Sequence, residues 1–312
     1  MKKSIISLSL FLCSAILLSA ETPQSRLNRA NDLMRSGSYE PAQAELKVLL
    51  HEVEEKGAPK LVFGILNSLA AIDIEMGRYE NAERLYLRSV PVWEALPPPQ
   101  RAAETEPQLN LLALYVQAGW LKKAEDIANR VTTADSGPRQ IRVLDGLGNL
   151  RCAQKRFREA EGYYRQALAL AGASVEQDIA GTLWNSLGVA LASQRKWNDA
   201  IDAFQQALIH HERTWGEEHP VLIAILTNLG GICLEQKRSQ EAVASLVRAR
   251  RLAESNFGSS YPGLYQILVL LGRSYDRTKQ TAQAKATRSE AELLRRSAGI
   301  PHRVNINDLA RR

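Results

Sequence analysis

Residues 184–207 read WNSLGVALASQRKWNDAIDAFQQA, and this stretch decides the fold. In its first half W, L, G and L recur at spacings of three and four, which is typical of one face of an amphipathic helix. In its second half W, A, F and A recur at spacings that keep them on one helix face as well. Only about three residues, around Arg195 and Lys196, separate the two halves. The stretch therefore predicts two helices joined as an antiparallel hairpin.

The same hairpin pattern recurs along the chain. Its central alanine falls at seven positions that lie 36 to 42 residues apart: Ala42, Ala82, Ala124, Ala160, Ala200, Ala242 and Ala284. The residue twelve positions earlier is Ala or Gly in every copy except the third, which has Leu112. Small side chains at both positions let the two helices of a pair approach closely. The sequence predicts an all-α fold, an α-solenoid of about seven antiparallel helix pairs.

The motif W-x-x-L-G followed by A-x-x-x-F resembles the signature of the tetratricopeptide repeat. The long period and the linker Gly216–Val221 are similar to the kinesin-light-chain-like branch of that family, in a bacterial and exported form. The resemblance covers residues 24–296 and implies a right-handed superhelix whose first helices line a concave, protein-binding surface. The chain departs from the pattern where Ser239 and Thr281 replace the aromatic residue of the turn, and where Arg288 replaces an aromatic residue in the last repeat.

Residues 1–20 have the order of a secretory signal peptide: Lys2 and Lys3, then an uncharged apolar run, then Ser19 and Ala20. We expect cleavage near Ala20 and a periplasmic or extracellular protein. An uncleaved anchor is the alternative, although the run is shorter than the ~20 apolar residues that cross a bilayer. We expect no membrane insertion after cleavage, a repeat array over residues 21–300, and a separate tail over residues 301–312.

Chemistry-bearing motifs are sparse. With 312 residues, 45% of them apolar, and three cysteines, the chain is neither disordered by composition nor a disulfide-dense scaffold. Gly146 and Gly148 begin a dinucleotide-like pattern, but they lie within an expected helix rather than after a strand. A metal site built on His210, His211 and His219 is disfavoured, because adjacent helical residues point ~100° apart. We predict no enzymatic activity and no cofactor.

Asparagines recur on the inward face of the expected first helices. An extended peptide backbone needs both donors and acceptors, and a carboxamide supplies both. The alternative is that these asparagines tie one helix to the next, and both interpretations stay open. The predicted peptide-binding residues of the middle repeats are Arg142, Asp145, Asn149, Asn185, Val189 and Ser193.

Charge is uneven along the chain. Residues 236–312 contain 15 Lys and Arg against 6 Asp and Glu. An exported protein rarely meets nucleic acid, so we expect these basic residues to form a solvated face or a protein-binding surface. The preferred hypothesis is a non-enzymatic scaffold that binds a protein or peptide partner, with no nucleic acid. An envelope-assembly or oligomerisation module is the second hypothesis, a hydrolase or metal protein is the third, and the sequence leaves the oligomeric state open.

Overall fold

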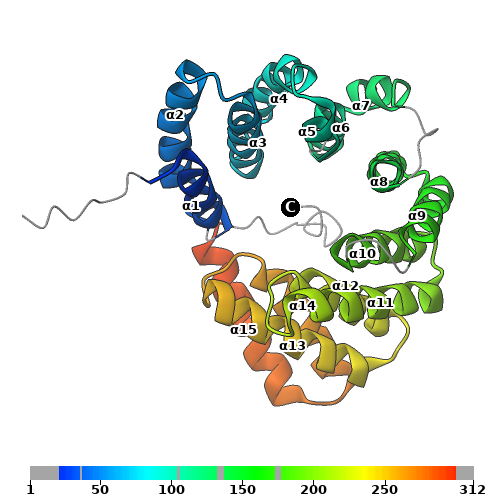
Figure 1. The fold of residues 1–312 in the computed structure, drawn as a ribbon. Coiled ribbons are helices and arrows are strands. Elements are labelled where there is room, and N and C mark those ends of the chain that lie inside the picture. Colours follow the sequence, from blue (N-terminus) through cyan, green and yellow to red (C-terminus); the bar gives the residue numbers. More distant parts are fainter. Residues whose placement is uncertain (1–20, 36, 104–105, 132–136, 173–176, 300–312) are drawn as a thin grey trace, which may run out of the picture. The chain divides into compact units, whose positions relative to one another are not determined.

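The computed structural model describes residues 21–35, 37–103, 106–131, 137–172 and 177–299, and these residues form helices and turns without a strand (Figure 1). The expected signal peptide and the expected tail lie outside the described residues. Within the described part, no helix is both long and apolar enough to cross a membrane. The predicted all-α solenoid of helix pairs is confirmed.

Each of the seven alanines lies in the second helix of a pair. We call the two helices of a pair the A helix and the B helix. The pairs are α1 (Pro23–Arg35) and α2 (Tyr39–Glu55), α3 (Pro59–Glu75) and α4 (Tyr79–Glu94), α6 (Pro107–Gln117) and α7 (Leu121–Ala128), α8 (Pro138–Ala153) and α9 (Phe157–Ala171), α10 (Gln177–Ser193) and α11 (Trp197–Trp215), α12 (Leu222–Glu235) and α13 (Ser239–Phe257), α14 (Leu264–Arg277) and α15 (Thr281–Ser297).

Every hairpin turn contains a residue with positive φ, five positions before the alanine. In the first three turns this residue is glycine, which adopts the left-handed region without a steric penalty. In the other four turns it is a basic residue with φ between 59° and 61°: Lys155, Arg195, Lys237 and Lys279. The turn geometry is therefore kept through the array even where the residue type is unfavourable for it.

Close packing within the fourth and fifth pairs depends on the small residue of the A helix. A Cβ atom added at Gly148 would lie 2.5 Å from the ring of Tyr164, and one added at Gly188 would lie 2.8 Å from the ring of Phe204. Both rings stand four residues after the central alanine, which is itself fully buried in these pairs. The expected contact between the two helices is present, and a large B-helix ring fills the space that the glycine leaves.

The chain divides into two compact units after Asn110. Unit 1 has a core of leucine and isoleucine side chains from α1, α2 and α3, including Leu46, Ile65 and Leu66. Unit 2 has a continuous core that runs from Ile141 on α8 to Leu294 on α15. In each unit, an A helix packs on its own B helix and on the following pair, as expected for a repeat array.

The segment between α4 and α6 contains three consecutive prolines, Pro97, Pro98 and Pro99. Helix α4 ends at Glu94, and a short extra helix, α5 (Pro98–Ala103), follows it. Proline at the first position of a helix lacks only an N–H that would have no helical partner, so the run can end one helix and begin another. Helix α6 then spans the boundary between the two units.

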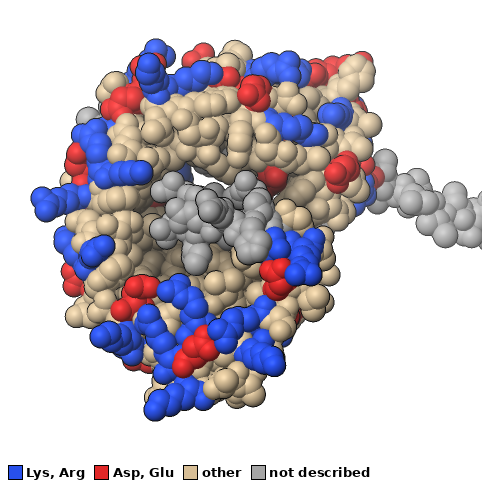
Figure 2. Space-filling view, turned by 180° about the vertical axis from the view of Figure 1, so that it is seen from behind, with Lys and Arg blue, Asp and Glu red and all other residues tan. Residues whose placement is uncertain are grey.

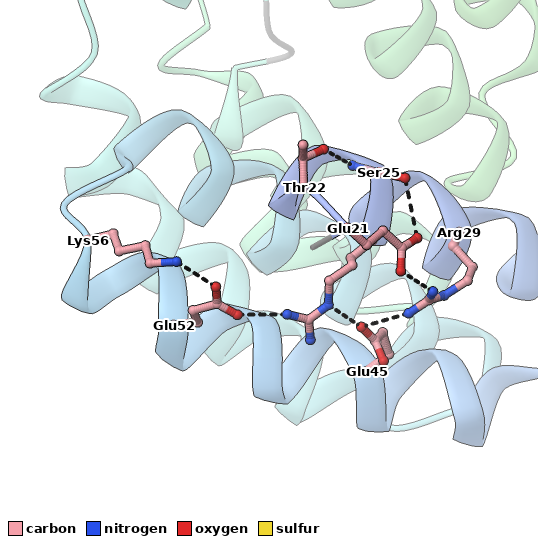
Figure 3. A network of polar contacts seen from close by, with 8 residues as sticks. Glu21, Thr22, Ser25, Arg29, Glu45, Glu52 and Lys56 are labelled. Atoms are coloured by element: carbon pink, nitrogen blue, oxygen red, sulfur yellow. Dashed lines mark hydrogen bonds and ion pairs between the residues drawn. The ribbon is translucent and has the colours of Figure 1, made fainter. Parts of the chain in front are cut away.

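The first helix pair is joined by a network of ion pairs (Figure 3). Arg26 on α1 donates to Glu45 at 2.6 Å and to Glu52 at 2.7 Å, both on α2. Lys56 donates to Glu52 at 2.7 Å, and Arg29 lies 3.1 Å from Glu45. The side chain of Arg26 is 19% exposed, so this network is partly shielded from solvent and stabilises the pair more than a single exposed ion pair does.

Candidate functional site

The A helices α8 and α10 contact each other within unit 2. Since their central alanines are forty residues apart, each position on α8 has an equivalent forty residues later on α10. Asp145 is equivalent to Asn185, and Asn149 is equivalent to Val189. Two of the predicted peptide-binding residues, Asp145 and Asn185, therefore occupy the same structural position in consecutive repeats.

The structure places the six predicted residues on these two helices. On α8, Arg142, Asp145 and Asn149 stand three and four residues apart and so share a face; all three are half-buried. On α10, the same spacing rule puts Asn185, Val189 and Ser193 on one face; Asn185 is half-buried, Val189 is 39% exposed and Ser193 is exposed. Together the six residues form a polar surface with one apolar side chain, and we call it the α8–α10 face.

Asn149 is held within its own repeat. The hydroxyl of Tyr164 on α9 donates a hydrogen bond of 2.8 Å to Asn149 Oδ1, and the Asn149 side chain also bonds to the carboxyl of Asp145. Asn31, at the same position of the first repeat, accepts a 2.9 Å hydrogen bond from the hydroxyl of Ser68 on α3. The helix-tie interpretation thus describes the contacts of these two asparagines.

Other polar atoms of the α8–α10 face are buried and have no hydrogen-bond partner among the described residues. They are Arg142 Nε, Asp145 Oδ1 and Asn185 Oδ1. In unit 1, Asn67 Oδ1 on α3 is in the same situation, and Asn67 stands at the position equivalent to Asp145 and Asn185. Because buried polar groups in folded proteins nearly always have a partner, recurrence at one repeat position calls for an explanation.

Burial also changes the proton affinity of the face. It raises the pKa of Asp145 to about 6, and the hydrogen bond from Asn149 opposes that rise only in part. Burial likewise raises the pKa of Tyr164, with smaller contributions from Cys152 and Asp145. Asp145 is therefore largely ionised at neutral pH but takes up a proton in mildly acidic solution.

The basic residues near the C-terminal end are engaged with acidic neighbours. Arg248 pairs with Glu212, and Arg251 pairs with Glu218 at 2.8 Å. Arg250 contacts Glu254 at 2.7 Å and Glu290 at 2.9 Å. In the lower part of Figure 2, blue basic groups stand among red acidic ones rather than in a uniform patch.

The histidines and glycines that suggested other chemistry have packing roles. The ring of His211 is buried against Gly181, and the ring of His219 stacks on Trp215 with centroids 5.2 Å apart. Gly146 accommodates Leu112. Among the described residues, no group of three His, Cys, Asp or Glu side chains gathers as a metal site, and Cys152 and Cys233 are not joined in a disulfide.

Sequence reasoning missed two features of the face. It did not identify Tyr164 as the partner of Asn149, although repeat 4 has Asn and Tyr where repeat 5 has Val189 and Phe204. It also treated Asn149 and Asn185 as one group. The forty-residue interval was the available signal, since it assigns them to different positions of the repeat.

Comparison with known proteins agrees with the repeat pattern. Tetratricopeptide repeat profiles match residues 178–255 and 222–291, residues 143–174, and residues 62–96. A search of curated protein sequences finds no match.

Solved structures show the same fold at low sequence identity. A Podosopora anserina protein with nearly identical kinesin-light-chain TPR-like repeats is 18% identical, with a TM-score of 0.53 over 62% of this chain and 95% of that one. The Cut9–Hcn1 hetero-tetramer of the APC/C gives 15% identity and a TM-score of 0.57 over 83% of this chain and 44% of that one. A Rap protein complexed with Competence and Sporulation Factor gives 10% identity and a TM-score of 0.55 over 92% and 99%. The helix pairs, the recurring small residues and these profile matches together identify the chain as a tetratricopeptide repeat protein.

Proposed function

We propose that the chain is a non-enzymatic scaffold that binds a protein or an extended peptide segment along the α8–α10 face. The observation that carries this proposal is the set of buried, unpartnered polar atoms of Arg142, Asp145 and Asn185. Leaving such an atom without a partner costs about 1–3 kcal/mol. An extended peptide brings one N–H and one C=O per residue and can satisfy these atoms. Val189, beside them, offers contact area for an apolar side chain.

The relatives support a binding role of this kind. Tetratricopeptide repeat proteins typically act as interaction scaffolds, and two of the similar structures are complexes by their descriptions: Cut9 with Hcn1, and a Rap protein with Competence and Sporulation Factor. Low identity limits that support to the fold, so the partner has to be inferred from the residues of the face itself.

The proposal is tested by crosslinked capture from the native cell envelope with variants of the α8–α10 face. We expect Arg142→Ala and Asn185→Ala to reduce captured partners without lowering the melting temperature, because Arg142 Nε and Asn185 Oδ1 are buried and have no hydrogen-bond partner among the described residues. Gln205→Ala is the matched control, since Gln205 is exposed on the B helix α11. Equal capture by all three variants would show that the partner binds elsewhere.

A second candidate function is assembly through the B helices. Their outer surfaces expose aliphatic side chains on α9, α11, α13 and α15: Leu170 (47%), Ile209 (55%), Val247 (43%) and Leu293 (69%). Exposed apolar surface of this kind favours association with a partner or with a second copy of the chain. Sedimentation of Ile209→Ser and Leu293→Ser variants tests it: loss of an oligomer supports assembly, and a monomeric wild type excludes self-association.

We also propose that the protein is exported and acts in the cell envelope or outside the cell, on the basis of the composition of residues 1–20. N-terminal sequencing of envelope-fraction protein is expected to find a chain that begins near Glu21. Intact Met1 in that fraction would reject cleavage.

A further inference from the structure

We propose that the segment bound at the α8–α10 face presents a basic side chain, of lysine or arginine, to the carboxylate of Asp145. This inference rests on the proposed function and names the chemistry of the partner. It starts from the carboxyl oxygen Oδ1 of Asp145, which is buried and has no hydrogen-bond partner in the part of the chain that the structure describes.

Buried charges elsewhere in the protein are paired. Asp73 on α3, which is 4% exposed, lies 2.6 Å from Arg78 and accepts a 3.1 Å hydrogen bond from Gln43. Arg151 on α8, which is 9% exposed, lies 2.7 Å from Glu125. Asp145 takes part in no ion pair with a described residue, so the fold leaves its charge without the compensation that Asp73 and Arg151 receive.

Among the described residues, no lysine, arginine or histidine forms an ion pair with Asp145, and the pKa of its carboxyl is raised by burial. On α9 its neighbour is Tyr164, whose pKa is raised by burial, so the phenol is neutral at physiological pH. The thiol of Cys152 belongs to the same cluster through Tyr164, and the Asn149 amide is uncharged. Arg142 stands one turn earlier on the same helix, but no ion pair joins it to Asp145 in the described part of the chain.

The equivalent position in the next repeat adds a second acceptor. Asn185 Oδ1 on α10 is also buried and has no hydrogen-bond partner within the described ranges, and α8 and α10 are in contact. A carboxylate and an amide oxygen together require hydrogen-bond donors. Lysine and arginine offer three and five donors, respectively, and no acceptor. A basic side chain therefore donates to the Asp145 carboxylate and compensates its buried charge at the same time, and donors of the same segment are available for Asn185.

The inference predicts a pH dependence. Asp145 loses its charge as the pH falls through its pKa of about 6. A peptide held through a basic side chain should therefore bind more weakly at pH 5 than at pH 7.5, whereas a peptide without that side chain should be affected much less. Asp145→Asn should remove the difference between the two peptides at both pH values.

The experiment uses the full chain as bait for a displayed library of random 12-residue peptides at pH 7.5. We expect the retained peptides to carry Lys or Arg at one fixed place. Replacing that residue by norleucine should weaken binding to the wild type roughly 10- to 100-fold, which is the loss expected for one buried charge-assisted contact. Asp145→Asn should bind both peptides about equally. Asp126→Asn is the matched control, because Asp126 is exposed on α7.

The outcomes separate this inference from the proposed function. Two results would overturn the role of Asp145 but leave peptide binding in place. In the first, the retained peptides share no basic residue. In the second, the norleucine replacement weakens binding to Asp145→Asn as much as it weakens binding to the wild type. Retention of no peptide overturns both that role and peptide binding. Misfolding of Asp145→Asn is controlled by its melting curve, and asparagine already stands at this repeat position in Asn67 and Asn185.

Discussion

Replacing Asp145 by asparagine should stabilise the free protein at neutral pH. In the folded chain the Asp145 carboxyl forms no ion pair with a described residue, and burial raises its pKa from 3.8 to about 6. Below pH 3.8 a carboxyl with a raised pKa is protonated in both the folded and the unfolded state, so the stability that it contributes as a neutral buried group is fully present. That contribution is lost as the pH rises through about 6, because the folded state must then bury a charge.

The magnitude follows from the same two values. A pKa difference of one corresponds to about 1.4 kcal/mol, so the difference between 3.8 and about 6 corresponds to about 3 kcal/mol at pH 7.5. Near pH 5 the folded carboxyl is mostly protonated, and roughly half of this cost is gone. If unit 2 unfolds as one, Asp145→Asn should raise its Tm by roughly 6–12 °C at pH 7.5. Near pH 4 it should change the Tm little.

Urea unfolding followed by far-ultraviolet circular dichroism at pH 4, 5, 6 and 7.5 measures this difference. The reciprocal control is Asn185→Asp, which buries a carboxyl at the equivalent position of the next repeat and should destabilise the chain at pH 7.5 but not at pH 4. A stability gain of Asp145→Asn that is the same at every pH would refute the electrostatic origin. A loss at pH 7.5 would show that the charge of Asp145 is compensated in the free protein.

Further substitutions test the packing of the repeats. Arg195→Gly should raise the unfolding free energy by roughly 0.5–1 kcal/mol, because glycine relieves the cost of positive φ at that turn; unchanged urea unfolding would contradict this. Gly188→Ala should lower the unfolding free energy by about 1–3 kcal/mol, because the added Cβ overpacks the contact with Phe204. Gly162→Ala should raise it by up to about 1 kcal/mol, because the added Cβ meets nothing within 4 Å. Equal effects of the two substitutions in calorimetry would argue against the close contact at Gly188. Asn149→Ala should cost about 1–3 kcal/mol, since it leaves the buried hydroxyl of Tyr164 with the weaker acceptor Cys152 Sγ at 3.7 Å, and Asn149→Ala in a Tyr164→Phe background should cost much less.

The helix pairs were predictable because they depend on a spacing of small and apolar residues that recurs within every repeat. Ala200 with Gly188 fixes the approach of two helices within about a dozen residues, and no distant contact has to be known. Positive φ in the hairpin turns was less visible. Gly37, Gly77 and Gly119 mark it in the first three turns, but Lys155 and its equivalents favour ordinary helical geometry and take the left-handed conformation because the two packed helices impose it.

The candidate site was predictable only as a stripe of residues. Helical spacing places Asn149 and Asn185 on inward faces, but it does not say which of them has a partner. That depends on the neighbouring B helix: Tyr164 brings a hydroxyl to Asn149, whereas Phe204, its equivalent in the next repeat, brings none. The raised pKa of Asp145 depends on burial by several elements at once, and residue spacing carries no measure of that.

The unpartnered positions are consistent with an array in which stability is nearly a sum over neighbouring repeats. In such an array a local cost at Asp145 and Asn185 weakens α8 and α10 and their immediate neighbours, while α12 to α15 keep their own contacts. A ligand that supplies the missing donors should then return stability at the same place. Hydrogen exchange should accordingly show that a bound basic peptide protects α8 to α10 first, and that Asp145→Asn protects the same helices without any peptide. Protection spread evenly over unit 2 in both cases would mean that these repeats unfold as one body and that the cost at Asp145 is shared by all of them.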